Sequence, residues 1–134
     1  MFRPPIKISP TAVERLRPYV DEQSLREARI RVTPPWSWVP RVLGATATTL
    51  GNDICFRPGR YHEHDAPGLA LIAHECRHVR QYREMGAVSF LVRYILGAIR
   101  VRFRHAEHPL ELEPLVIQAQ ARAELRAALD AEQA

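Results

Sequence analysis

The sequence predicts an α+β domain, in which a small antiparallel sheet packs on a central helix and further helices complete the C-terminal side. Short segments with β-branched or alternating residues lie between positions 28 and 56. An apolar run leads into a helical pattern over 66–85, and two more helical patterns follow, over 87–104 and 110–131. The length of 134 residues suits a single domain spanning 1–134 that buries a sizeable core.

Composition and charge exclude several classes of protein. A hydrophobic content of 46% and a charged content of 25% are ordinary for a globular chain. The net charge is +4, and every basic residue except Lys7 is Arg, with a cluster of Arg between 77 and 104. Such a basic stripe can contact phosphates or an anionic membrane surface. Because no nucleic-acid-binding motif accompanies it, we expect no specific nucleic acid and no transmembrane segment, while membrane-surface contact stays open.

The cysteines and the N-terminus bear on the compartment. Cys55 and Cys76 are too few for a disulfide framework, and helical geometry places Cys76 on the core side of its helix. The N-terminus lacks the apolar segment of a cleaved signal peptide. We therefore expect a cytoplasmic protein, or one exported without a cleaved signal peptide.

The first half of the chain combines short helices with strands. Ser9 is a suitable N-cap, and Pro10 suits the first helical position after it. The turn signal Gly51-Asn52 predicts a β-hairpin. Apolar alternation and β-branched residues place the strands over 28–33, 45–50 and 53–56.

Several aromatic and histidine side chains lie in the predicted loops. Trp36 and Trp38 are expected to plug the core, and a substrate platform is the alternative. His62 and His64 flank a Glu on a polar loop, where we favour a surface location over a metal site. The segment over 87–104 is expected to be a buried helix, with an interfacial helix as the alternative.

The central helix contains the motif that bears on chemistry, His74-Glu75-Cys76-Arg77-His78, which reads H-E-x-x-H. Residues four apart share a helix face, so His74 and His78 can hold one Zn²⁺ ion. Glu75 lies at the rim of that face, where it can act as the general base toward a metal-bound water. Asp65 or Ala66 should start this helix, and Gly86 should end it.

A zinc site with two His ligands needs a third protein ligand. The sequence offers Glu111 and Glu113 at the start of the C-terminal helix, about 200° apart on a helix, so only one of them can face the ion. His105 and His108 are rivals of lower weight. The oxyanion could be steadied by any of several loop and helix side chains: His62, His64, Tyr61, Tyr82, Tyr94, His105 and His108.

The segment over 43–83, with Gly68 before the apolar lead-in and Gln81 after H-E-x-x-H, resembles the metallopeptidase-like domain of proteins associated with extracellular contractile injection systems. Pro109-Leu110-Glu111-Leu112-Glu113 resembles the E-x-x-x-D helix of gluzincins. The resemblance implies a zincin-like fold and Glu111 as the third metal ligand. The chain departs from this pattern at Leu115, which stands where the family has an Asp that orients a ligating His.

These observations favour a hydrolase, a zinc-dependent metallopeptidase that cleaves a peptide or protein substrate. His74, His78 and Glu111 would hold Zn²⁺, and Glu75 would be the catalytic base. The alternative is a weakly active or inactive zincin-fold module that binds within a larger protein assembly. An Arg-rich nucleic-acid binder is a weaker third hypothesis.

Overall fold

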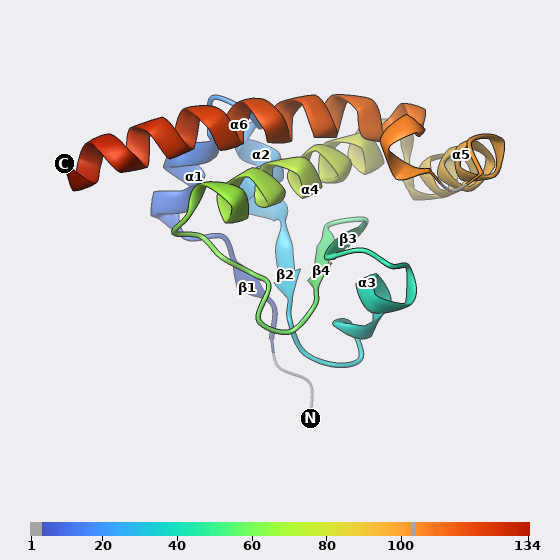
Figure 1. Ribbon diagram of the computed structural model, residues 1–134. Coiled ribbons are helices and arrows are strands. Elements are labelled where there is room, and N and C mark those ends of the chain that lie inside the picture. Colours follow the sequence, from blue (N-terminus) through green and yellow to red (C-terminus); the bar gives the residue numbers. More distant parts are fainter. Residues whose placement is uncertain (1–3, 103) are drawn as a thin grey trace.

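The computed structural model describes residues 4–102 and 104–134, and only the backbone at position 105. Figure 1 shows the long C-terminal helix lying along the central helix, with the sheet on the other side of the central helix. The helix over 87–100, which precedes the C-terminal helix, lies at the end of the molecule opposite the C-terminus. The helices are α1 (Pro10–Leu16), α2 (Glu22–Glu27), α3 (Trp38–Val42), α4 (Ala66–Met85), α5 (Ala87–Arg100) and α6 (Pro109–Gln133), with a 3-10 turn, η1, at His105–Glu107. The α+β class is therefore confirmed.

The sheet is mixed, so the predicted antiparallel sheet is wrong at one pairing. Its strands are β1 (Ile6–Lys7), β2 (Arg29–Arg31), β3 (Ala47–Leu50) and β4 (Asp53–Phe56), in the spatial order β1-β2-β4-β3. β2 pairs with β4 in parallel, and the other two pairings are antiparallel. The chain crosses through α3 after β2, so the second strand of the hairpin becomes the neighbour of β2 and runs in the same direction.

Side-chain burial explains why β4 is inside and β3 is at the edge. Ile54, Cys55 and Phe56 are all buried, which is the continuous apolar pattern of a strand covered on both faces. In β3, buried and partly exposed residues alternate, as in a strand that is covered on one face only. The hairpin and its Gly51-Asn52 turn are as predicted.

The tryptophan segment departs from the sequence prediction. We predicted a loop or irregular strand over 36–40; Trp36 lies in a turn, and α3 begins at Trp38. Trp38 is 56% exposed and does not plug the core. Trp36 is half-buried, with the guanidinium of Arg31 over its ring, 4.8 Å from the centroid. α3 packs on the sheet through Pro40 and leaves the Trp38 ring exposed. Sequence periodicity could not show which of these side chains faces the sheet.

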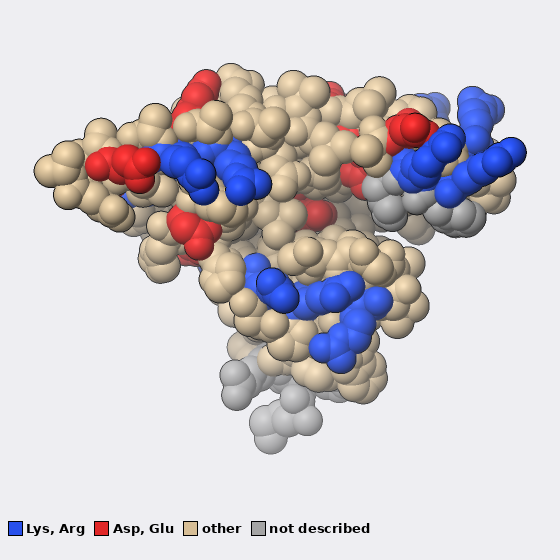
Figure 2. All heavy atoms as spheres, viewed as in Figure 1, with Lys and Arg blue, Asp and Glu red and all other residues tan. Residues whose placement is uncertain are grey.

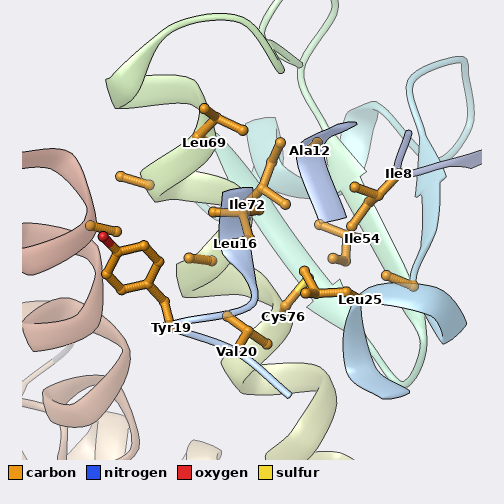
Figure 3. Close-up of a cluster of buried hydrophobic side chains, with 14 of the residues drawn as sticks. Ile8, Ala12, Leu16, Tyr19, Val20, Leu25, Ile54, Leu69, Ile72 and Cys76 are labelled. Atoms are coloured by element: carbon orange, nitrogen blue, oxygen red, sulfur yellow. The ribbon is translucent and has the colours of Figure 1, made fainter. Parts of the chain in front are cut away.

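The main core lies between α4, the sheet and the N-terminal helices (Figure 3). Leu69, Ile72 and Cys76 of α4 point into it, and Leu16 and Ile54 meet them from α1 and β4. Cys76 is a free, fully buried thiol on the core face of α4, as its position on the helix predicted. Burial raises the pKa of this thiol, so it stays neutral.

The boundaries of α4 follow from capping. The Asp65 side chain accepts a hydrogen bond from the Gly68 N–H at 2.7 Å, and Pro67 occupies the first turn. Gly86 ends the helix with φ +83, a conformation that side chains other than glycine rarely adopt. Both ends agree with the sequence prediction.

A methyl group at position 68 has no room. A Cβ there would lie 2.7 Å from His62 Cβ and 2.8 Å from Asp65 Oδ1, and it would also collide with the His62 carbonyl oxygen. We expect Gly68→Ala to lower the free energy of unfolding by about 1–3 kcal/mol, measured by urea denaturation. Helix propensity alone would give a gain of about 1 kcal/mol, so an unchanged or higher stability would contradict this packing.

The prediction that the helix after α4 is buried is only half right. Phe90 and Ala98 of α5 are buried, but Leu91, Ile95 and Ile99 are 42%, 57% and 58% exposed. α5 packs through one face only, because the chain turns sharply at Gly86 and leaves α5 beside the ends of α4 and α6 rather than beneath them.

Candidate metal centre

α4 supplies the two histidines of the centre. His74 and His78 are one helical turn apart, and their ring centroids are 5.1 Å apart. Both rings are buried, with 8% and 4% of each residue exposed. The apolar residues before His74 pack one face of α4 against the core. The face that carries both imidazoles is covered by α6.

α6 brings a carboxylate to the two rings. Glu111 Oε1 lies 2.9 Å from His74 Nε2 and 2.7 Å from His78 Nε2. His108 caps the start of α6 by accepting a hydrogen bond from the Leu110 N–H. Glu111, in the first turn, is thereby directed at α4. One ligand atom from each of these three residues lies within 4.8 Å of the others.

The alternative carboxylate faces elsewhere. Glu113 has a side chain that is 64% exposed, and it forms an ion pair with Arg77 at 3.0 Å. His108 points away from the centre, because its Nε2 lies 2.7 Å from the backbone oxygen of Tyr94. Of the candidates for a third ligand whose side chains the structure describes, Glu111 alone meets both histidines, and the His105 side chain lies outside that set.

The charges of the centre are strongly coupled. Burial alone would raise the pKa of Glu111, but hydrogen bonds with His74 and His78 outweigh it and hold the pKa well below its usual range. Burial would lower the pKa of His78, but the hydrogen bond with Glu111 and the charge of Glu75 outweigh it and raise the pKa.

The donor set fits a divalent metal ion. Two imidazole nitrogens and one carboxylate oxygen converge on one point inside the protein, which is the ligand set His₂Glu. His74 Nδ1 is buried and has no hydrogen-bond partner within the described part of the chain. The Nε2 atoms of both rings, rather than their Nδ1 atoms, are directed at the shared point.

Glu75 lies next to this centre and is held by the sheet. The Thr49 hydroxyl on β3 donates a hydrogen bond to Glu75 Oε2 at 2.7 Å. Only 5% of Glu75 is exposed. The edge strand of the sheet therefore positions the carboxylate that sequence analysis predicted to be the general base. No local pattern around position 49 indicates this contact, because it joins residues that are far apart in the chain.

An aromatic stack closes the other side of the centre. Tyr82, Phe90 and Tyr94 stack in series, and the Tyr94 ring then lies on His108, with centroids 4.2 Å apart. The Tyr94 hydroxyl donates to Glu111 Oε2 at 2.7 Å. Burial and this bond raise the pKa of Tyr94, so the hydroxyl keeps its proton and remains a donor.

Two other candidates for steadying an oxyanion, Tyr82 and His108, belong to this aromatic stack, and the loop candidates make other contacts. His62 and His64 are exposed, in line with the predicted surface location. The Tyr61 hydroxyl donates to Glu63, which also accepts from the Ser9 N–H and so ties this loop to the start of α1. Tyr94 is thus the candidate whose hydroxyl contacts a residue of the proposed metal-ligand set.

Gln81 supplies a support for His78 that the sequence analysis missed. Its Oε1 lies 2.8 Å from His78 Nδ1, and its Nε2 donates to the Leu110 carbonyl on α6. The carboxylate expected at position 115 is absent, but an amide three residues after His78 orients that ring. The spacing of three residues on one helix is the signal that could have revealed it.

We expect Gln81→Leu to weaken Zn²⁺ binding by about 10–100-fold, because it removes the acceptor that orients the His78 ring. Competition with a chromogenic chelator measures the affinity. Gln120→Leu, at an exposed position on α6, is the matched control and should bind as the wild type does. Equal affinities of the two variants would show that Gln81 does not support the ligand.

Figure 2 shows that one face of the molecule is hollowed between the C-terminal helices and the part that contains β3 and α3, with atoms of Asp or Glu visible inside the hollow.

A comparison with protein families shows which family the chain matches. The model of the eCIS core domain matches residues 8–86, which run from the end of β1 to the end of α4. The chain belongs to the eCIS core domain family.

The matched range covers part of the candidate centre. It includes His74, Glu75 and His78 and ends before Glu111. It supports the predicted association with extracellular contractile injection systems, and hence a role in a larger assembly. No curated protein and no solved structure matches the chain. None of the helices in the described residues has both the length and the hydrophobicity that crossing a membrane requires.

Proposed function

We propose that this eCIS core domain is a zinc-dependent metallopeptidase. The observation behind the proposal is the convergence of His74, His78 and Glu111 at one point, with Glu75 adjacent in the sequence. Zinc is favoured over harder cations because two of the three ligands are imidazoles. A bound zinc ion would acidify a water molecule and polarise the scissile carbonyl.

The residues of the chain supply the proton transfer. Glu75 takes the proton of the attacking water and delivers it to the leaving amine. The hydrogen bond from Thr49 restricts the Glu75 carboxylate to one orientation and leaves its other oxygen for this role. Tyr94 stays protonated and donates its one hydroxyl hydrogen to Glu111, so it would steady the developing oxyanion by turning from Glu111 to the substrate.

The edge of the sheet suits an extended substrate. β3 has a neighbour on one side only, so its other side can pair with a peptide through backbone hydrogen bonds. Because Thr49 of this strand contacts Glu75, a peptide added to β3 would pass near the general base.

A module that binds zinc without turnover is the second candidate. The family match favours it, because membership in the eCIS core domain indicates a place in an assembly and not a reaction. Leu115 also stands where a gluzincin has its orienting Asp.

Metal analysis combined with a cleavage assay tests the proposal. The protein would be stripped with a chelator, reloaded with Zn²⁺, analysed by mass spectrometry for bound metal, and incubated with a peptide library. We expect one zinc per chain and cleavage that the chelator abolishes. Zinc binding without cleavage would favour the binding module, and cleavage that survives the chelator would overturn the zinc mechanism.

A further inference from the structure

α5 presents a continuous apolar stripe to solvent. Its residues recur at spacings of three and four, the period of one helix face. All are 42–77% exposed: Val88, Leu91, Val92, Ile95, Leu96 and Ile99. An apolar surface of this extent marks an interaction site rather than a random feature.

The stripe cannot be buried by a rotation of α5, because the opposite face already packs. Phe90 is buried in the aromatic stack, and the Tyr94 hydroxyl bonds to Glu111. A Cβ at Gly97 would lie 2.8 Å from the His108 ring, so the backbone of α5 rests directly on that ring. The outer face of α5 therefore needs a partner from outside the described chain.

The charges around the stripe select an anionic partner. Arg93 and Arg100 are exposed and lie along one flank of the stripe, and neither forms an ion pair within the described residues. Arg102 is a further exposed base just after the helix, and the sequence from 87 to 106 contains no Asp or Glu. Figure 2 shows basic side chains, all of them Arg in this part of the sequence, gathered over this end of the molecule.

We propose that α5 docks on the surface of an anionic lipid bilayer, with the apolar stripe inserted and Arg93 and Arg100 at the headgroups. The 14 residues of α5 span about 21 Å, less than the ~30 Å hydrocarbon core, so the helix lies in the interface. A second copy fits less well, because two stripes packed together would bring unneutralised Arg side chains close to each other. The proposal is independent of zinc binding and peptidase activity.

Vesicle co-sedimentation tests the proposal with the full chain. We expect binding to vesicles of phosphatidylcholine with 30% phosphatidylserine and weak binding to pure phosphatidylcholine. Ile95→Glu should reduce the partition coefficient at least about 10-fold. Arg93→Gln with Arg100→Gln should reduce it about 5-fold for each Arg, and added salt should weaken binding of the wild type.

Matched controls lie at the opposite end of the molecule. Ala127→Glu and the pair Arg122→Gln with Arg126→Gln introduce the same residues at exposed positions of α6 and should bind as the wild type does. Circular dichroism and zinc content confirm that every variant is folded. Absence of vesicle binding, or equal binding to both lipid mixtures, would overturn the proposal. So would a dimer in light scattering that Ile95→Glu dissociates without any vesicle binding, since the stripe would then belong to a second copy.

Discussion

Glu111→Gln is expected to abolish tight Zn²⁺ binding. The substitution keeps the size of the side chain but removes the charge that both His74 and His78 face at 2.9 and 2.7 Å. Loss of an orienting partner alone costs a zinc site about 10–100-fold in affinity, so loss of a ligand should cost more. Isothermal titration of the metal-free protein with Zn²⁺ measures the change.

Glu113→Gln is the matched control for this prediction. It makes the same chemical change two residues away, on an exposed side chain that pairs with Arg77. We expect wild-type zinc affinity, and zinc at about 100 times its Kd should still stabilise this variant by ~2.7 kcal/mol. If Glu113→Gln lost zinc and Glu111→Gln kept it, the assignment of the third ligand would be wrong.

Glu75→Gln is expected to lower the rate of peptide hydrolysis by about 10²–10⁴-fold while leaving zinc binding intact. The amide cannot accept the proton of the attacking water. Its oxygen can still accept the hydrogen bond from Thr49, so the fold around β3 and α4 should be preserved. The rate of cleavage of a quenched fluorescent peptide, together with zinc content, separates loss of chemistry from loss of the metal.

Glu84→Gln on the same helix controls for the general effect of removing a carboxylate. Glu84 is exposed and pairs with Arg80, far from the chemistry. We expect its hydrolysis rate to match the wild type. A Glu75→Gln protein that retained zinc and the full rate would reject Glu75 as the general base and leave the binding module as the better description.

The sequence predicted the residues of the candidate metal centre better than it predicted the residues around that centre. The two histidines follow from a spacing of four on one helix, and that helix was bounded by Asp65 and Gly86. Glu111 was one of two carboxylates that periodicity left open, because periodicity tells which residues share a helix face but not which face turns inward. Only the docking of α6 on α4 separates Glu111 from Glu113.

The sheet and α5 show the same limit. A hairpin turn is a local signal, so Gly51-Asn52 was read correctly. The pairing of β2 with β4 joins segments more than 20 residues apart and depends on how the crossover through α3 packs. The apolar pattern of α5 predicted a buried helix, but apolar periodicity is the same whether a face meets the core or an outside partner.

From the sequence by itself came the α+β class, the position and ends of α4, the pairing of His74 with His78, and Glu75 as the residue beside them. These properties depend on residues within about one or two helical turns, where backbone geometry alone decides which side chains meet. The tertiary structure alone decided that Glu111 completes the candidate centre, that Thr49 and Tyr94 lie around it, and that one face of α5 is left exposed. Those contacts join distant segments, and burial of the whole core determines which of them form.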